Sequence, residues 1–137
     1  MDRVIFACVH NAGRSQMAAA FFNAVVNPAL ASATSAGTQP GERVHPEVIE
    51  VMREVDIDLS GMRPQRLTEE LARQASLLIT MGCGDECPYV PGLQRDDWPL
   101  HDPKGLSIEE VRQIRDDIGQ RVSILVETRG WHRNAAD

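Results

Sequence analysis

The sequence has few basic residues in any one place, no long apolar run and little cysteine. Its 137 residues carry a net charge of −6 at pH 7, with one lysine against thirteen arginines and no basic cluster. This excludes a surface that neutralises nucleic-acid phosphates, so any anion must be bound locally. The apolar runs fall well short of the roughly 20 residues that span a membrane. We therefore expect a cytoplasmic protein that binds neither membrane nor nucleic acid.

Cysteine occurs three times, as Cys8, Cys83 and Cys87. A small odd number of cysteines in an intracellular chain does not make a disulfide framework, and it suggests reactive thiols or metal ligands instead. A chain of this length forms one domain and is long enough to bury a core of its own. We expect residues 1–137 to be a single domain.

Strand-like and helix-like segments alternate along the chain. The expected strands cover residues 4–7, 29–37, 77–81 and 95–100, and the expected helices cover residues 16–27, 46–55, 68–74 and 107–127. Such alternation predicts an α/β fold with a four-stranded parallel sheet, helices on both faces (a three-layer αβα arrangement) and ligands at the carboxyl ends of the strands.

The periodicity of the first helix and the composition of the tail give two finer expectations. In the first helix, the apolar stripe that should face the sheet contains Met17, Ala20, Phe21, Ala24 and Val25. The tail from Arg129 has no such period, and we expect it to fray.

The segment from Cys8 to Ser15 follows an apolar strand and precedes an alanine-rich helix. A short loop at a helix N-terminus points backbone N–H groups into one concavity, where the helix dipole adds positive charge. Gly13 suits a close approach to a ligand, and the guanidinium of Arg14 can bind a tetrahedral oxyanion in bidentate fashion. The same groups would favour the thiolate form of Cys8, which stands at the mouth. The expected oxyanion-binding residues are Val9, His10, Asn11, Ala12, Gly13, Arg14 and Ser15.

A plainer interpretation of this loop is a small buried cysteine at a strand end and an ordinary arginine in a first helical turn. The position of the loop between a buried strand and a helix, with Ser15 directly after Arg14, favours the thiolate that handles an oxyanion.

The pair Cys83 and Cys87 lies in a loop from Gly82 to Gly92 and has several interpretations. Structural zinc usually has four N or S ligands, and neither a second cysteine pair nor a histidine at ligand spacing is present, so we predict no metal site. Cysteines four apart in an extended loop are too far apart for a disulfide, whose Cα atoms lie within about 7 Å. A loop flanked by glycine could fold to bring them together.

The run Cys-x5-Arg-Ser-Gln-Met-Ala at residues 8–18 resembles the low-molecular-weight tyrosine phosphatase superfamily, and specifically its thiol-dependent arsenate reductases. Ser35-Ala36-Gly37 resembles the end of the second strand of that family, and the resemblance covers nearly the whole chain. It implies the low-molecular-weight phosphatase fold and an arsenate reductase that needs no cofactor.

The resemblance also implies a mechanism with arsenate as substrate, or phosphate or sulfate as its analogue. Cys8 would attack arsenic, with Arg14 and the loop amides stabilising charge, and water would leave. Cys83 would attack the Cys8 sulfur, expelling arsenite, and Cys87 would take over the disulfide, which thioredoxin would reduce. If either loop cysteine is idle, a small thiol such as mycothiol would have to attack the Cys8 adduct.

Asp102, followed by Pro103, is the last expected catalytic residue. In the resembling superfamily an Asp-Pro presents its carboxyl over the anion loop, where it can protonate a leaving oxygen. A solvated loop aspartate is the alternative.

Two departures from the family pattern affect ion and substrate binding. Positions that hold potassium in some relatives carry Ala19 and Gln65, so we expect no strong potassium site. Lys104 follows Pro103 where phosphatases have tyrosine, and aromatic residues make up only 4% of the chain, so a pocket for an aryl phosphate is poorly provided for. Phosphatase activity and a non-catalytic thiol module, binding a metal or sensing redox state, are the alternative functions.

Overall fold

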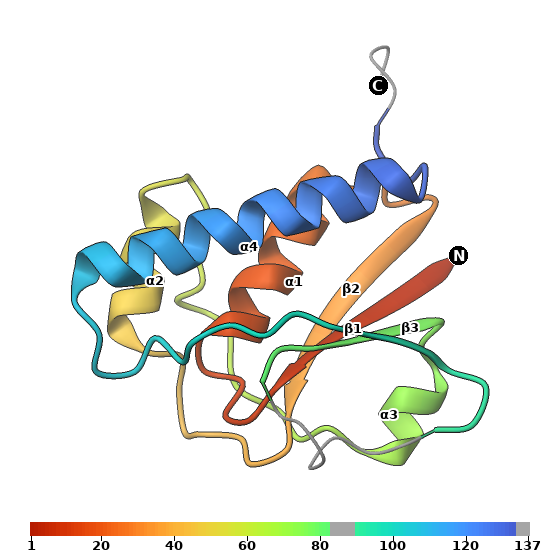
Figure 1. Ribbon diagram of the computed structural model, residues 1–137, viewed down its shortest axis with the longest axis horizontal. Coiled ribbons are helices and arrows are strands. Elements are labelled where there is room, and N and C mark those ends of the chain that lie inside the picture. The colour runs from red at the N-terminus through yellow and green to blue at the C-terminus, as the bar shows by residue number, and fades with distance from the viewer. Residues whose placement is uncertain (83–89, 134–137) are drawn as a thin grey trace.

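Four parallel strands form the central sheet of the computed structural model, which describes residues 1–82 and 90–133 (Figure 1). The strands are β1 (Asp2–Cys8), β2 (Ala31–Gly37), β3 (Leu77–Thr80) and β4 (Gln94–Asp97), in the order β2-β1-β3-β4. The predicted α/β fold with a four-stranded parallel sheet is confirmed. The last strand begins one residue earlier than predicted and ends at Asp97.

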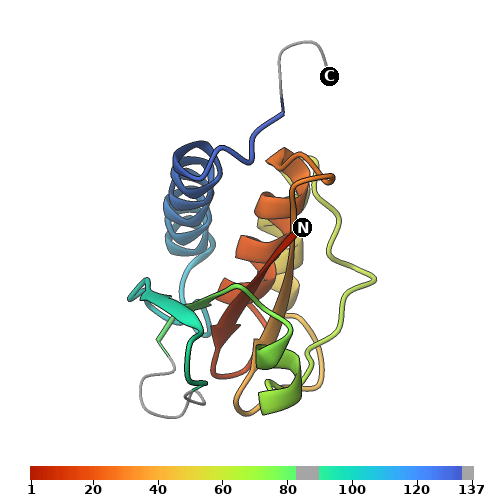
Figure 2. The same cartoon turned by 90° about the vertical axis from the view of Figure 1, so that its right-hand side faces the viewer.

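Helices cover both faces of the sheet, as the three-layer prediction requires. In Figure 1, α1 (Arg14–Val25) and α4 (Ile108–Thr128) lie above the sheet, with α2 (Pro46–Arg53) beside them, and α3 (Glu69–Arg73) lies below; Figure 2 shows the same layers from the side. Alternate residues of β1 serve the two faces, because successive strand side chains point in opposite directions. Val4 and Phe6 belong to the large core under α1 and α4, whereas Ile5 and Ala7 belong to the smaller core over α3.

Local capping chemistry explains where the helices begin. Ser107 caps α4 in a capping box with Glu110, and the side chain of Thr68 accepts a hydrogen bond from the N–H of Leu71 at the start of α3. Pro46 occupies the first turn of α2, where its missing N–H costs nothing. These starts agree with the sequence prediction.

The predicted apolar stripe of the first helix was right for Met17, which is buried, and for Ala20 and Phe21, which pack against the core, but wrong at its end. Phe22 is fully buried, while Ala24 and Val25 are exposed. The helix begins at Arg14, so the anion loop sets its rotation and turns Arg14, Ser15 and Phe22 toward the sheet. Packing of the loop therefore overrides the weak periodicity of an alanine-rich segment.

The prediction of a frayed tail was wrong for the described residues up to Arg133. Trp131 is buried, and its ring lies 5.8 Å from that of Phe22 in an edge contact. His132 forms an antiparallel bridge with Val26, which anchors the end of the chain to the end of α1. A turn at Gly130, whose φ of 71° suits glycine, directs the chain back onto the helix.

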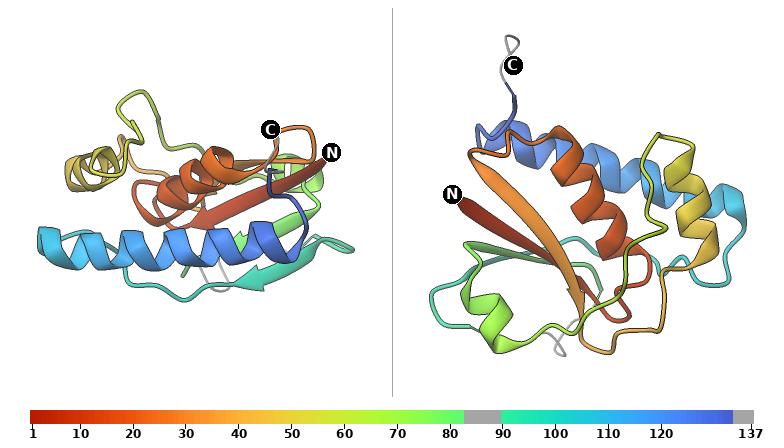
Figure 3. Two further views of the ribbon diagram at one scale, coloured as in Figure 1. Left: turned by 90° about the horizontal axis from the view of Figure 1, so that it is seen from above. Right: turned by 180° about the vertical axis from the view of Figure 1, so that it is seen from behind.

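The carboxyl ends of the strands gather at one end of the molecule, away from both described chain ends (Figure 3). Cys8 pairs with Gly37 at the end of β1 and β2, and Thr80 ends β3 beside them. The loops that follow these strands therefore share one rim. No helix in the described parts of the chain is long and apolar enough to cross a membrane.

Candidate active site

Hydrogen bonds from outside fix the shape of the loop after β1. The carbonyl groups of six consecutive residues each accept one such bond, and all peptide bonds described are trans. A trans peptide points its N–H opposite to its C=O, so the N–H groups that follow these carbonyls turn to the inner, concave side. The six bonds run to Cys8 from Thr38 (3.2 Å), Val9 from Gln39 (2.8 Å), His10 from Gly41 (2.9 Å), Asn11 from the Gln16 side chain (3.1 Å), Ala12 from His45 (2.9 Å) and Gly13 from Met17 (3.0 Å).

The thiol of Cys8 ends a short chain of hydrogen bonds. The amide nitrogen of Asn11 donates to Ser15 Oγ at 2.7 Å, and Ser15 Oγ lies 2.8 Å from Cys8 Sγ. Because Ser15 Oγ accepts from Asn11, its hydroxyl proton is free to point at the sulfur. This hydroxyl is therefore placed to hydrogen-bond the sulfur when Cys8 acts as a nucleophile. Cys8 is only 2% exposed, so this donor acts with little competition from water.

Asn11 holds the loop in a conformation that most residues avoid. Its φ of 52° lies in the left-handed region, which asparagine tolerates better than other residues with a side chain. Its side-chain oxygen accepts hydrogen bonds from the N–H of Gln65 at 2.9 Å and from Gln16 Nε2 at 3.2 Å. This bracing by Gln16 and Gln65 was not predicted from the sequence. Gln16 lies inside the recognised motif, but no local signal points to Gln65.

Arg14 lies beneath the rim with its guanidinium held in place. The residue is 6% exposed, and Nη1 donates to the carbonyl of Leu100 at 3.0 Å. Gly82, with a φ of 97°, passes so close that a Cβ there would lie 2.5 Å from Nη1. A carbonyl and a glycine backbone thus fix the guanidinium, which leaves its second nitrogen toward the mouth.

Asp102, the predicted proton donor, approaches this second nitrogen. Its Oδ2 is 3.9 Å from Arg14 Nη2 and 3.8 Å from His10 Nδ1, while its Oδ1 accepts the N–H of Lys104 at 3.0 Å. Pro103 is buried against the loop, where a Cβ on Gly13 would lie 2.7 Å from Pro103 Cγ. The glycine therefore lets the Asp102 loop approach the anion loop closely.

The positions aligned with potassium ligands do not fit a cation here. Ala19 has no side-chain oxygen, and Gln65 Nε2 donates to the carbonyl of Ser35 at 2.8 Å and to Thr34 Oγ1 at 3.1 Å. The carbonyl oxygen of Ser35 and Oγ1 of Thr34 therefore face an N–H donor in place of a cation. Within residues 1–82 and 90–133, no three His, Cys, Asp or Glu side chains are grouped to hold a metal ion.

The structure thus brings Cys8, Arg14, Ser15 and Asp102 together with the loop amides. Cys83 and Cys87, the other predicted catalytic residues, lie outside the described residues, which stop at Gly82 and resume at Val90.

Comparison with known proteins identifies the family to which the chain belongs. Residues 3–133 match the family model of the low molecular weight phosphotyrosine protein phosphatases. A protein of Halobacterium salinarum, provisionally named an arsenate reductase, is 40% identical over 127 residues, covering 89% of each chain. The glutaredoxin arsenate reductase of Synechocystis is 36% identical over 129 residues, covering 92% of this chain and 97% of its own.

A solved structure shows the same fold. The thioredoxin-dependent arsenate reductase of Corynebacterium glutamicum superposes with a TM-score of 0.81 at 36% sequence identity. The match covers 93% of this chain but 61% of that one, so the described fold corresponds to part of the longer protein.

Proposed function

The chain belongs to the low molecular weight phosphotyrosine protein phosphatase family, as one of its arsenate reductases, and we propose that it works through a relay of three cysteines that thioredoxin resets. The observation that carries this proposal is the contact between Cys8 Sγ and Ser15 Oγ at 2.8 Å, at the mouth of an amide-lined loop. It provides an activated sulfur beside a site for a tetrahedral oxyanion.

Arsenate would bind with its oxygens on the inward N–H groups and on the guanidinium of Arg14. Such preorganised donors stabilise the charge that develops during attack at no cost of reorganisation. The Cys8 thiolate would form a sulfur–arsenic bond while one arsenate oxygen leaves. Asp102 Oδ2, 3.9 Å from Arg14 Nη2, is positioned to give that oxygen a proton so that it leaves as water.

The reduction would take place in the second step. Cys83 attacks the Cys8 sulfur, the sulfur–arsenic electron pair stays on arsenic, and arsenite leaves from a Cys8–Cys83 disulfide. Cys87 then attacks Cys83, which frees Cys8 and leaves a Cys83–Cys87 disulfide for thioredoxin to reduce. Support comes from the Corynebacterium glutamicum relative, which is thioredoxin-dependent. A relay of free thiols needs a reducing compartment, which is the cytoplasm in a bacterial cell.

Turnover of arsenate with thioredoxin and thioredoxin reductase tests this function in the wild type and in the variants Cys8→Ser, Cys83→Ser and Cys87→Ser. We expect the wild type to consume reductant in proportion to arsenate and all three variants to lose turnover to the level of the buffer. Ser123→Ala, on the exposed face of α4, provides the control and should retain wild-type turnover.

Three results would contradict the relay. Loss in Cys8→Ser alone would favour a small thiol such as mycothiol as the attacking species. Hydrolysis of a phosphate ester that survives loss of Cys83 and Cys87, without arsenate turnover, would make the chain a phosphatase. Stoichiometric metal in the purified protein without any turnover would indicate a thiol-based binding module.

A further inference from the structure

Asp102 has an imidazole beside it that the reaction described so far does not use. His10 Nδ1 lies 3.8 Å from the same oxygen, Oδ2, that faces Arg14. We propose that His10 passes protons between solvent and Asp102, whose carboxyl protonates the leaving oxygen. His10 is thus a positioning residue that acts through Asp102. This proposal rests on the proposed function, because it concerns the acid of that reaction.

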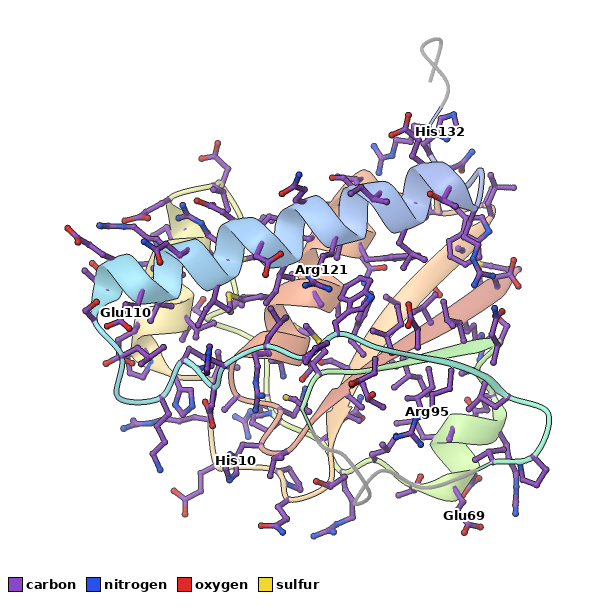
Figure 4. All side chains as sticks on the ribbon, in the orientation of Figure 1. His10, Glu69, Arg95, Glu110, Arg121 and His132 are labelled. Carbon is purple, nitrogen blue, oxygen red and sulfur yellow. The ribbon has the colours of Figure 1, made fainter. Side chains whose placement is uncertain are left out.

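The backbone of His10 is held by a hydrogen bond, whereas its side chain is open to solvent. Its carbonyl is held by the N–H of Gly41 at 2.9 Å, so its backbone cannot drift from Asp102. Its side chain is 43% exposed, and Figure 4 shows it in the lower part of the view. The ring nitrogen Nδ1 therefore approaches Asp102 while the side chain is also open to water, and Asp102 itself is 39% exposed. A proton relay needs access of this kind at both ends.

The two oxygens of Asp102 have different partners. Oδ1 accepts the backbone N–H of Lys104 at 3.0 Å, which occupies that oxygen and fixes the rotation of the carboxyl. The proton of the acid form therefore belongs on Oδ2, the oxygen that faces His10 and Arg14. Arg14 cannot supply this proton, because a guanidinium stays charged in proteins. An imidazole can, because it gains and loses a proton between about pH 5 and 8.

The distance of 3.8 Å corresponds to an ion pair, whereas a direct hydrogen bond would be about 2.7–3.2 Å long. A bridging water, or a small rotation of the exposed ring, completes the path. The other charged or titratable groups near this pair, among the described residues, are Arg14 and Cys8 below it, Glu42, Arg43 and His45 across the neighbouring hollow, and His101 and Lys104 on the Asp102 loop.

The proton balance of one cycle is simple. The Asp102 carboxyl gives its proton to the leaving oxygen, which departs as water, and becomes a carboxylate. The imidazolium of His10 returns a proton to Oδ2 and becomes neutral, and water protonates the imidazole again. No electron moves in these steps, so the thiol chemistry is unchanged.

Calorimetry with inorganic phosphate tests the pair without any turnover. In a Cys8→Ser background, which removes the titration of the thiol, phosphate is bound at pH 8 in two buffers of different ionisation enthalpy. Binding of the phosphate dianion should be accompanied by the uptake of about one proton. Adding His10→Gln should reduce the uptake to less than about half of that. His132→Gln, at the opposite end of the molecule in Figure 4, should take up as many protons as the parent.

Kinetics test whether His10 acts through Asp102. We expect His10→Ala to lower kcat/KM for arsenate about tenfold at pH 8 and less at pH 6, and added imidazole to restore much of the loss. In an Asp102→Asn background, removal of His10 should cause no further loss, because the group it serves is gone.

Equal proton uptake in the parent and in His10→Gln would overturn the proposal. So would a loss in His10→Ala that imidazole does not restore and that adds fully to the loss in Asp102→Asn, because that pattern belongs to a residue that only shapes the loop. A wild type that does not reduce arsenate would refute the proposed function, while the calorimetric comparison would still decide for or against His10.

Discussion

Arg14 shows how closely single residues fit together in this site. Its guanidinium is buried between the carbonyl of Leu100 and the backbone of Gly82, so its direction is set before any anion arrives. Gly82 helps to set the direction of the guanidinium in two ways. It leaves room for Nη1, and it adopts a φ of 97° that a residue with a Cβ rarely accepts. The position of the charge that binds the oxyanion therefore depends on a residue with no side chain.

Replacement of Gly82 by alanine tests this dependence. The added Cβ would lie 2.5 Å from Arg14 Nη1, so the guanidinium must move. We expect KM for arsenate to rise at least about tenfold, and the free energy of unfolding to fall by about 1–2 kcal/mol from the strained φ. Gly61→Ala is the matched control, since no atom lies within 4 Å of its Cβ position, and it should change neither quantity. An unchanged KM in Gly82→Ala would show that the guanidinium is not fixed in this way.

The members of the anion loop could be predicted from local sequence, whereas most contacts to the loop from distant parts of the chain could not. Cys8, Arg14 and Ser15 belong to one loop. Its position between a strand and the start of a helix, together with its glycine, predicts an anion site. The hydrogen bond from Gln65 to Asn11 and the approach of His10 to Asp102 join positions 54 and 92 residues apart, and a pattern read along the chain carries no information on such contacts. The catalytic roles of Cys8, Arg14, Cys83, Cys87 and Asp102 stay predictions.

At the scale of elements, a cluster of charges joins α2 to α4. Arg115, largely buried, donates to the carbonyl of Val51 at 2.8 Å and to Glu54 at 2.7 Å, and Arg112 reaches the same carboxylate at 2.7 Å. The hydrogen bond from Arg112 holds the pKa of Glu54 below its ordinary value of 4.5. Burial opposes this lowering, and a hydrogen bond from Arg115 adds to it. One carboxylate thus connects two arginines of α4 to the C-terminal end of α2.

The carboxylate of Glu54 predicts that the stability of the fold depends on pH. A pKa that is lower in the folded state means that the contribution is present above pH 4.5 and is lost as the pH falls through the folded value. We expect the Tm of Glu54→Gln to lie below that of the wild type at pH 7 and the two to converge toward pH 3. Thermal melting from pH 7 to pH 3 measures this difference in Tm. Glu127→Gln, at an exposed position of α4, is the control. A constant difference in Tm from pH 7 to pH 3 would contradict the role of the carboxylate charge.

The elements themselves were largely predictable, because their boundaries depend on local chemistry. Ser107 and Pro46 fix helix starts by capping and by ring geometry, wherever the helix later packs. The face that a helix buries is a different matter: in α1 the loop before Arg14 turns Phe22 inward, and alanine-rich periodicity was too weak to show it.

For the molecule as a whole, the segment from Arg129 to His132 packs on α1 at the end opposite the site. Trp131 packs on Phe22, Arg129 lies 5.6 Å from the centre of the tryptophan ring, and the bridge between His132 and Val26 ties the chain to α1. The alternation of strands and helices predicted the fold class, but nothing in the composition of the tail predicted this docking, since one tryptophan among polar residues has no period.

Trp131→Ala should separate stability from activity. Loss of a buried tryptophan costs about 3 kcal/mol, and we expect the free energy of unfolding in urea to fall by that amount. KM for arsenate should not change, because the site lies at the other end of the strands. Ile124→Ala, 57% exposed on α4, should cost less than about 0.5 kcal/mol. A small loss in Trp131→Ala would mean that the tail contributes little to folding.

Lys104 is the only lysine of the chain and lies on the rim of the candidate site, with its backbone bonded to Asp102. The amine of Met1, which precedes β1, lies at the far end of the molecule. Any amine-directed coupling, to a dye, a biosensor surface or a cross-linker, therefore has two outcomes. Attachment at Met1 leaves the mouth open, whereas attachment at Lys104 covers it. An amine-immobilised sample is a mixture of competent and obstructed molecules, and a dye placed on Lys104 alone reports on the mouth without any mutation.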